Sequence, residues 1–430
     1  MTTKLYFKDV TIFDGDAFFR GSLTTDGDRI TRIVRNGEIP DGGTPTAAGE
    51  AVLIMPGMVN LHTHVPMTLF KGVAEDLPLK DWLEKRIFPL EAKFISREMC
   101  RIAGQWGMAE MLLAGVTAFA DMYFFEEDIA AAAKEIGIKA AIGGGVINFT
   151  TPDGKSPDQM IAYTVELAET YRDDPWIFPC CAPHSPYLTN ENCLLTLAEI
   201  SQKYRIPFHI HMAETRHEQE AYQKQHGKRE FERFDELGLL SDRFIAAHSV
   251  WVDDKEMDLM ASRGVTVAHC PSSNLKLGSG IAPVAAMVER GVNVAVATDG
   301  SASNNNLDVL KEAELAAKVQ KGTAHDPTVL PAGMVLKMVT ANPGRALGNS
   351  FGRLIEGGAA DIVQVRLDSV GIAPVHDPAA AIVYASSPAD IAAVWVNGRQ
   401  TVKEGKLLTV DRAALGNEMD RLAAAVRRSL

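Results

Sequence analysis

The sequence contains few cysteines, and they follow no pattern typical of a disulfide framework or a thiolate metal site. Among 430 residues there are five cysteines, an odd number, and no two of them form a Cys-x-x-Cys pair. This argues against a disulfide-stabilised secreted fold and against a thiolate zinc site. Reduced thiols are typical of cytoplasmic proteins, and we expect this location.

Long apolar runs and an excess of positive charge are also lacking. No run of about 18 apolar residues occurs, so no membrane span is expected. The beginning, MTTKLYFKDVTIFDGD, lacks the apolar core of a signal peptide and predicts strands with a turn. The net charge of −12 gives no electrostatic basis for binding nucleic acid or an anionic membrane. A small molecule is therefore the expected partner.

The middle of the chain alternates short β-rich runs with helical stretches. This rhythm predicts an α/β fold, a (β/α)8 TIM barrel. A doubly wound sheet is the alternative, but it needs a glycine-rich phosphate-binding turn after an early strand, and the sequence has none. The eight runs are residues 58–64, 116–123, 139–147, 177–184, 207–214, 244–250, 265–270 and 292–299.

Both ends of the chain follow a different pattern from the middle. Residues 1–55 and about 353–410 alternate apolar and polar positions between turns, which predicts short antiparallel strands, and an amphipathic helix is predicted at the C-terminus. We expect residues 1–55 and 353–430, including this helix, to form one small β-sandwich domain. Residues 56–352 would then form the metal-dependent catalytic barrel.

Histidines and acidic residues end several of the eight runs. In a (β/α)8 barrel the C-terminal ends of the strands meet on one face, where active sites lie. A single histidine at a strand end is more often structural, but so many on one face indicate a metal site, and imidazoles with a carboxylate suit Zn²⁺ or Fe²⁺. The residues concerned are His62, His64, His184, His211, Glu214, His248, His269 and Asp299.

Two His-x-His pairs occur, at 62 and 64 and at 209 and 211. Residues two apart on a strand point to the same side, so each pair is aimed at one place. The spacing alone does not show which residue of the second pair, His209 or His211, binds the metal. Because His209 lies one layer deeper, we interpret it as barrel packing or as support for a metal ligand.

The residues near Asp299 and Glu214 indicate where these two carboxylates point. Ala295 and Ala297 share the strand face of Asp299 and leave room around it, which favours an inward Asp299. Glu214 follows His211 by three residues, so it could reach over a metal without binding it. A carboxylate at a helix start is the structural alternative for Glu214.

These residues and their surroundings resemble the amidohydrolase superfamily, in particular its mononuclear deaminase branch, over nearly the whole chain. Within that branch, GVAEDLPLKDWLEKRIFPLE and DMYF resemble the 5′-methylthioadenosine/S-adenosylhomocysteine deaminases and in part the s-triazine hydrolases. GGAADIVQV resembles a strand of the family's small β-domain. The other matching motifs are PGMVNLHTH, PHSPYL, HMAET, AAHSVW, HCPSSNLKLGSGIAPV and TDGSASNNNLD.

The resemblance implies one divalent metal ion per subunit, with zinc preferred and iron as the alternative. Two-metal members usually have a modified lysine in the fourth strand, and WIFPCCAPH has no lysine. We also expect a homo-oligomer, because closed dimers are the commonest assembly. The implied metal ligands are His62, His64, His211 and Asp299.

The resemblance also implies the roles of the remaining site residues. Glu214 would shuttle a proton, His248 would assist the hydrolytic water, and Asp299 would accept a proton from that water. Glu91 would bind ribose hydroxyls, and His184 would contact a ring nitrogen of the base. The roles of His209 and His269 stay open.

The implied function is that of a metal-dependent aminohydrolase, which deaminates an adenosine-like nucleoside of the 5′-methylthioadenosine, S-adenosylhomocysteine, adenosine or 5′-deoxyadenosine class. The nucleoside deaminases of this group carry arginines just after the third strand, whereas GGGVINFTTPDGKSPDQ has none and offers only Lys155. This departure favours a shorter 5′-substituent or another ring similar to an aminopurine. The alternatives are an s-triazine hydrolase, a free-base aminohydrolase and, more remotely, a barrel scaffold without catalysis.

Overall fold

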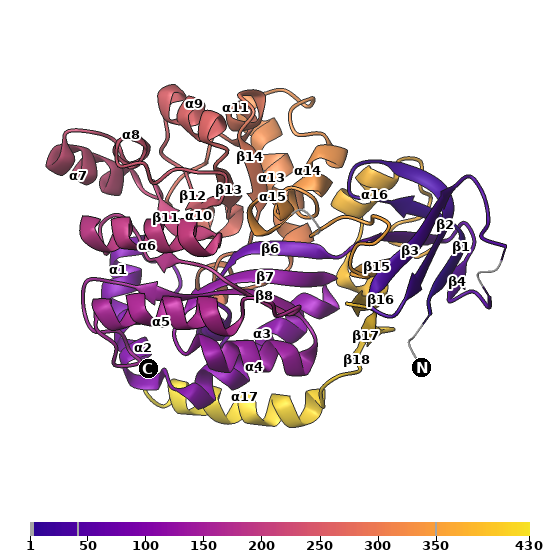
Figure 1. The fold of residues 1–430 in the computed structure, drawn as a ribbon, viewed down its shortest axis with the longest axis horizontal. Helices are drawn as coiled ribbons and strands as arrows, with labels where there is room; N and C mark the ends of the chain where they lie inside the picture. The colour runs from indigo at the N-terminus through magenta and orange to yellow at the C-terminus, as the bar shows by residue number, and fades with distance from the viewer. Residues whose placement is uncertain (1–3, 41–42, 349–350) are drawn as a thin grey trace.

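The middle of the chain forms the predicted (β/α)8 barrel, as Figure 1 shows in indigo to orange. The computed structural model describes residues 4–40, 43–348 and 351–430. The fourth barrel strand is split into two short pieces, whereas the other seven are continuous. In chain order the strands are β6 (Met58–Thr63), β7 (Val116–Tyr123), β8 (Lys139–Val146), β9 (Ile177–Pro179) with β10 (Ala182–Pro183), β11 (Phe208–Met212), β12 (Phe244–His248), β13 (Thr266–His269) and β14 (Asn293–Val296).

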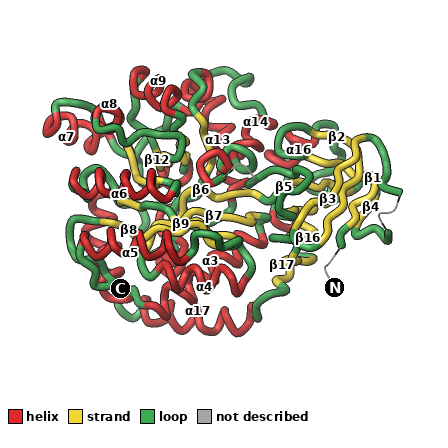
Figure 2. Tube along the Cα trace, viewed as in Figure 1, coloured by secondary structure: helices red, strands yellow, loops and turns green. Residues whose placement is uncertain are grey.

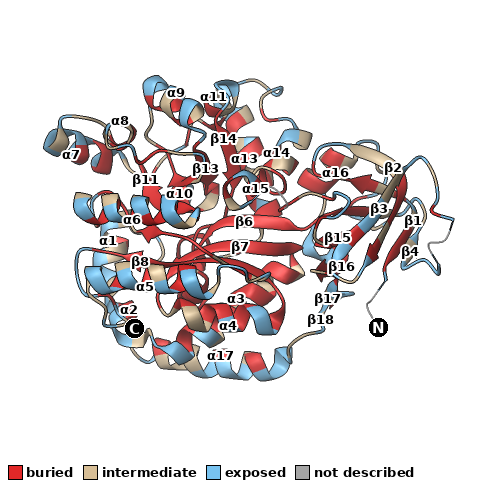
Figure 3. Ribbon diagram, viewed as in Figure 1, coloured by how far each residue is buried: buried red, intermediate tan, exposed pale blue. Residues whose placement is uncertain are grey.

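Backbone hydrogen bonds close these strands into a ring. Parallel ladders join β6 through β10 and, separately, β11 through β14. The first gap closes where His209 N donates to the Cys181 carbonyl over 2.8 Å, and the second where Asp299 N donates to the His62 carbonyl over 3.0 Å. All residues of β6, β7 and β8 are buried (Figure 3), as expected for parallel strands covered on both faces.

Helices surround the barrel, and each strand is followed by at least one. The segment after β6 is long and carries four short helices, with a π-helical turn, η2, between two α-helical pieces. π-Helical turns are frequent at functional sites. The helices are η1 (Val65–Phe70), α1 (Leu79–Trp82), η2 (Leu83–Ile87), α2 (Phe88–Phe94), α3 (Arg97–Leu113), α4 (Glu126–Ile136), α5 (Pro157–Thr170), α6 (Glu191–Tyr204), α7 (Arg216–His226), α8 (Glu230–Glu236), α9 (Asp254–Arg263), α10 (Pro271–Lys276), α11 (Val284–Glu289), α12 (Ser301–Asn304), α13 (Val309–Ala324), α14 (Ala332–Met338) and α15 (Gly344–Leu347).

Both ends of the chain contribute to one further sheet, at the right of Figure 1. The sheet is continuous and strongly curled. The curl is shown by Phe7 of β1 and Trp395 of β16, which pack edge to face with ring centroids 5.5 Å apart although two strands lie between β1 and β16. A small apolar core fills the curl. The strands are β1 (Tyr6–Phe13), β2 (Phe18–Asp26), β3 (Arg29–Arg35), β4 (Ala47–Ala48), β5 (Val52–Pro56), β15 (Ile362–Arg366), β16 (Ile391–Val396), β17 (Arg399–Lys403) and β18 (Lys406–Leu407).

The C-terminal helix packs differently from the prediction, which grouped it with the small β-domain. α17 (Arg412–Arg427) lies along α3 of the barrel, as Figure 2 shows at the lower edge of the molecule. Its apolar stripe, including Met419 and Val426, joins the large barrel core, and Arg421 contacts Glu98 over 2.6 Å. The remaining helices are α16 (Pro378–Tyr384) and η3 (Pro388–Asp390). No helix in the described part of the chain is both long and apolar enough to span a membrane.

Candidate metal centre and active site

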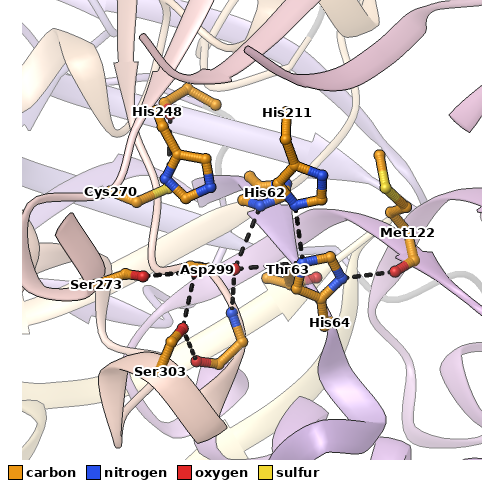
Figure 4. A network of polar contacts seen from close by, with 12 residues as sticks. His62, Thr63, His64, Met122, His211, His248, Cys270, Ser273, Asp299 and Ser303 are labelled. Carbon is orange, nitrogen blue, oxygen red and sulfur yellow. Dashed lines mark hydrogen bonds and ion pairs between the residues drawn. The ribbon is translucent and has the colours of Figure 1, made fainter. Parts of the chain in front are cut away.

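Four side chains from distant parts of the chain converge at the C-terminal ends of the barrel strands (Figure 4). His62 and His64 come from β6 and its end, His211 comes from β11, and Asp299 follows β14. One donor atom of each lies within 4.8 Å of the others. The four side chains predicted as metal ligands are therefore brought together.

Backbone carbonyls fix the orientation of two of the imidazoles. His64 Nδ1 lies 2.6 Å from the carbonyl oxygen of Met122, and His211 Nδ1 lies 2.6 Å from that of His184. Each Nδ1–H donates to its carbonyl, so each Nε2 keeps its lone pair and faces the centre. The two Nε2 atoms lie 3.2 Å apart.

His62 is oriented by another histidine. Its Nδ1 lies 2.8 Å from Nε2 of His209, and both rings are completely buried. His62 Nε2 lies 3.3 Å from Asp299 Oδ1 without the geometry of a hydrogen bond, so this nitrogen has no hydrogen-bond partner among the described residues. A buried nitrogen in this state fits the binding of a metal ion. His209 contacts the side of the His62 ring that faces away from the four donors, which agrees with its predicted position one layer deeper in the barrel.

Asp299 keeps a charged carboxylate at the centre. Its Oδ1 lies 3.3 Å from His64 Nε2, and its Oδ2 accepts hydrogen bonds from the hydroxyls of Ser273 and Ser303 over 2.6 and 2.8 Å. Burial opposes the charge, but His62 and His64 hold the pKa of Asp299 well below its usual value.

The protonation states of the imidazoles suit metal binding. Burial lowers the pKa of His211 far below its usual value and that of His62 to about 4, so both rings are neutral at pH 7. Burial also disfavours the charge of His64, but Asp299 and the Met122 carbonyl outweigh it and raise its pKa to about 9. A metal ion bound at the centre would displace this proton and leave Nε2 of His64 free to coordinate it. Three imidazoles and one carboxylate are donors that zinc and iron accept.

Glu214 and His248 lie next to these four side chains. His248 Nδ1 lies 2.9 Å from Oδ1 of Asn274, and His248 Nε2 lies 3.8 Å from Glu214 Oε2. The hydroxyl of Ser279 lies 3.4 Å from Glu214 Oε1. Burial raises the pKa of Glu214, so its carboxyl group retains a proton more readily than an exposed glutamate does.

A cavity of about 390 Å³ opens beside the four donors. His64, His211, Glu214, His248 and Asp299 line its inner end. Much of the remaining wall comes from three segments outside the strands, namely residues 79–92, 147–152 and 187–188, and the ends of β7 and β8 also contribute. The cavity therefore lies over the face of the barrel where the strands end.

Glu91 and His184, the two predicted substrate-binding residues, both line this cavity. Tyr123 donates its hydroxyl hydrogen to Glu91 Oε1 over 2.8 Å, yet burial dominates and raises the pKa of Glu91 to about 7. Burial lowers the pKa of His184 to about 3, which keeps this ring neutral. Trp82 also lines the cavity, and its indole N–H has no hydrogen-bond partner among the described residues.

His269 takes no part in the wall of the cavity. It ends β13 and is buried, and its Nδ1 makes no hydrogen bond within the described parts of the chain. Burial lowers its pKa to about 3, so the ring is neutral. Of the strand-end residues predicted to converge, two do not line the cavity: His269, and His62, which is completely buried.

Comparisons with known proteins agree with this architecture and donor set. A model of the amidohydrolase family matches residues 53–401. A 5-methylthioadenosine/S-adenosylhomocysteine deaminase from Thermodesulfovibrio yellowstonii is 42% identical over 424 residues, which cover 98% of this chain and 96% of the relative. The chain belongs to the amidohydrolase family. The membership inferred from its motifs is thus confirmed.

Two further proteins are similar to this amidohydrolase. A 5′-deoxyadenosine deaminase from Methanopyrus kandleri is 42% identical over 368 residues, covering 84% of each chain. The crystal structure of an adenosine deaminase from Xanthomonas campestris with bound zinc superposes with a TM-score of 0.94 at 34% identity, covering 99% of this chain and 98% of that one. The predicted barrel with a β-domain and the predicted class, a hydrolase acting on C–N bonds, are confirmed. The family, the zinc-bound neighbour and the cluster of histidines with an aspartate together support a divalent metal ion as the cofactor of this amidohydrolase.

Some residues that shape this amidohydrolase site were not identified from the sequence. Ser273 and Ser303 bind Asp299, and Tyr123 binds Glu91. Both serines lie in motifs that support the family resemblance, HCPSSNLKLGSGIAPV and TDGSASNNNLD, so these motifs could have identified them. The carbonyl contacts of His64 and His211 leave no signal in the sequence, because any residue supplies a carbonyl oxygen.

Proposed function

We propose that this protein is a metal-dependent deaminase that hydrolyses the exocyclic amine of an adenosine-like nucleoside and releases ammonia. The observation that carries the proposal is the placement of Glu214 and His248 beside the four-donor cluster, at the inner end of a cavity with room for a ring. The three relatives described above are named as deaminases of adenosine or of adenosine derivatives, which supports the same substrate class.

We assign the ligands as His62, His64, His211 and Asp299, and we propose zinc as the ion. Zinc accepts imidazole and carboxylate donors, and the similar adenosine deaminase carries it. Iron is the alternative with the same donor preference. An ion in this position lowers the pKa of a water molecule toward neutrality.

The protein's own groups then move the protons. We propose that Asp299 accepts one proton from the attacking water, because its carboxylate stays charged among the imidazoles. His248 holds the water through Nε2, since its Nδ1 is engaged by Asn274. Glu214, whose raised pKa favours the protonated form, donates to the ring nitrogen next to the attacked carbon.

Collapse of the tetrahedral intermediate completes the reaction. The proton held by Asp299 passes to the amino group, which leaves as ammonia. The new hydroxyl returns its proton to Glu214, and the ring nitrogen keeps the proton that it received. This sequence consumes one water molecule and restores both carboxyl groups.

Two residues would orient the nucleoside. His184 is neutral and lies at the inner part of the cavity, where its ring can bond a nitrogen of the base. Glu91 lies on the wall formed by residues 79–92 and accepts a hydrogen bond from Tyr123, which leaves its second oxygen for ribose hydroxyls.

The alternative within the same fold is an s-triazine hydrolase. Chloride leaves without protonation, whereas an amine must be protonated before it leaves. A buried glutamate with a raised pKa, Glu214, therefore favours deamination. A scaffold without catalysis is not favoured, because all four donors and both proton-transfer groups are in place.

An ammonia-release screen with metal analysis tests the proposal. The panel contains adenosine, 5′-methylthioadenosine, 5′-deoxyadenosine, guanine, cytosine and aminotriazines, with chloride release measured from chlorotriazines. We expect ammonia from the adenosine derivatives and about one metal ion per chain. Ammonia only from free bases, or chloride only from triazines, would overturn the assignment, and a metal-free protein would favour the scaffold.

A further inference from the structure

The outer part of the cavity is apolar. The reacting carbon must lie at the inner end, beside the four-donor cluster, so the 5′ end of a nucleoside points toward the outer wall. That wall is built by Trp82, Leu83 and Phe88 on one side and by Phe149 and Tyr187 on the other. Phe88 and Phe149 pack edge to face, with ring centroids 6.5 Å apart.

The cavity contains no permanently cationic side chain. None of the described residues that line it is a lysine or an arginine, whereas Glu91, Glu214 and Asp299 line it with carboxyl groups. Lys155 lies in the segment that follows the cavity-lining residues 147–152, but its ammonium group pairs with Asp153 and lies over the ring of Tyr163 at 4.5 Å. It is therefore held away from the substrate.

A second hollow, of about 760 Å³, continues beyond the same wall. It shares Leu79, Leu83, Phe88, Tyr187, Leu188 and Leu277 with the first cavity. Among the described residues that line it, Lys80 is the one side chain of permanent positive charge, and Glu84, Glu191 and Glu218 line it with carboxyl groups. The Glu191 carboxylate is paired with Arg233 over 2.9 Å. A substituent long enough to reach this hollow still meets an excess of carboxyl groups.

An anionic group on the substrate would therefore lose its hydration without gaining a partner. Burying a carboxylate is unfavourable unless a cation or several hydrogen-bond donors replace the water. A methylthio or alkylthio group has no such cost and gains contact with the aromatic wall. The ammonium group of an amino-acid tail could pair with Glu84, but the adjacent carboxylate would remain unpaired.

We propose that the site selects adenosine nucleosides with a short, neutral and apolar 5′-substituent and discriminates against a tail that carries a carboxylate, such as the amino-acid tail of S-adenosylhomocysteine. This inference rests on the proposed deaminase function. It assigns Trp82, Phe88 and Phe149 as the residues that determine specificity at the 5′ end.

A comparison matched for length tests the role of charge. The kcat/KM for ammonia release is measured for 5′-methylthioadenosine, 5′-butylthio-5′-deoxyadenosine and S-adenosylhomocysteine. We expect S-adenosylhomocysteine to fall at least about tenfold below the butylthio compound, which has a similar reach but no charge. Equal values for these two compounds would overturn the inference. Absence of ammonia from all three would instead overturn the proposed function.

A gain-of-function variant gives an independent test. Thr150 is exposed and lines the cavity, so Thr150→Arg adds a guanidinium at the outer wall without disturbing the core. We expect the ratio of kcat/KM for S-adenosylhomocysteine to that for the butylthio compound to rise about tenfold in this variant. Thr150→Gln, which is polar and uncharged although shorter than arginine, should leave the ratio unchanged. An unchanged ratio in the arginine variant, or an equal rise in the glutamine variant, would contradict the inference.

Discussion

At the residue scale, the site depends on unusual backbone conformations at strand ends. Ala213, His248 and Asp299 have φ values of 50°, 71° and 64°, in the left-handed region that residues other than glycine rarely adopt. Such positions cost on the order of 1–3 kcal/mol each and cluster at functional sites. Ala213 directly follows β11, His248 is the last residue of β12, and Asp299 lies three residues beyond β14, so all three bends occur where strands end beside the centre.

Substitution of Glu214 should separate catalysis from metal binding. Glu214→Gln removes the proton that we assign to the ring nitrogen but keeps the size of the side chain. We expect kcat for ammonia release to fall by about 10²–10⁴-fold. Metal content, measured by elemental analysis, should match the wild type, because Glu214 is not among the four donors. Loss of metal in parallel with activity would place Glu214 in the metal site.

Substitution of His209 tests whether it positions His62. Its Nε2 accepts the Nδ1–H of His62 when His62 binds metal through Nε2. We expect His209→Leu to weaken metal affinity by about 10–100-fold, measured by competition with a chelator of known affinity. His209→Gln keeps an acceptor and should retain most of the affinity. Equal metal affinity in the leucine variant and the wild type would show that His209 only packs inside the barrel and does not position His62.

At the element scale, buried carboxyl groups hold the loop that carries Glu214. Glu218 Oε2 accepts from the backbone N–H of Glu214 over 2.9 Å and forms a capping box with Thr215 at the start of α7. Glu230, at the start of α8, accepts from Ala213 N over 2.7 Å. The pKa of Glu218 is raised by burial and by the nearby Glu230. These bonds fix the turn between β11 and α7.

The buried Glu230 should make stability depend on pH. Burial raises its pKa from 4.5 to about 8, so the folded protein keeps a proton that the unfolded chain releases. The free energy of unfolding should therefore decrease as pH rises through this window. Glu230→Gln is neutral and keeps the acceptor for Ala213 N–H, so its stability should exceed that of the wild type increasingly between about pH 5.5 and 8.5.

Thermal or denaturant unfolding at several pH values measures this difference. Glu232 is a matched control on the same helix, because its carboxylate pairs with Lys255 and its pKa is lowered. Glu232→Gln should lack the gain with rising pH. An identical pH slope in Glu230→Gln and the wild type would show that Glu230 is ionised in the folded state.

At the scale of the whole molecule, the curled sheet covers the end of the barrel opposite to the site. Lys139, the first residue of β8, contacts Asp361 over 2.5 Å, and Asp361 also accepts from Asn397 N over 2.8 Å. We propose residues 56–352, the limits predicted from the sequence, as the barrel domain. The homo-oligomer and the cytoplasmic location stay predictions; size-exclusion chromatography with light scattering tests the first.

The ion pair between Lys139 and Asp361 should contribute to joining the two domains. Both side chains are less than 10% exposed, so Asp361→Ala leaves a buried ammonium without a partner. We expect a loss of about 3–5 kcal/mol in the free energy of unfolding. The double variant Lys139→Met/Asp361→Leu should recover most of this loss. If the single variant unfolds like the wild type, water or another group compensates the charge.

The sequence by itself determined the barrel and the residues of its reactive face. Alternation of strand and helix patterns is local, and the side chain that ends a strand is read directly, so His62, His211, His248 and Asp299 were placed from the sequence alone. The packing of α17 was not predicted, because amphipathic periodicity shows that a helix has an apolar face but not which surface covers it.

Only the tertiary structure decided how these residues work together. The ring closes through the bond from Asp299 N to the His62 carbonyl, and imidazoles are aimed by carbonyls of distant strands, contacts that no sequence pattern encodes. The cavity wall likewise joins residues 79–92 and 147–152, whose proximity depends on the closed barrel. Side-chain chemistry is a property of the sequence, whereas distance, burial and the resulting pKa shifts are properties of the fold.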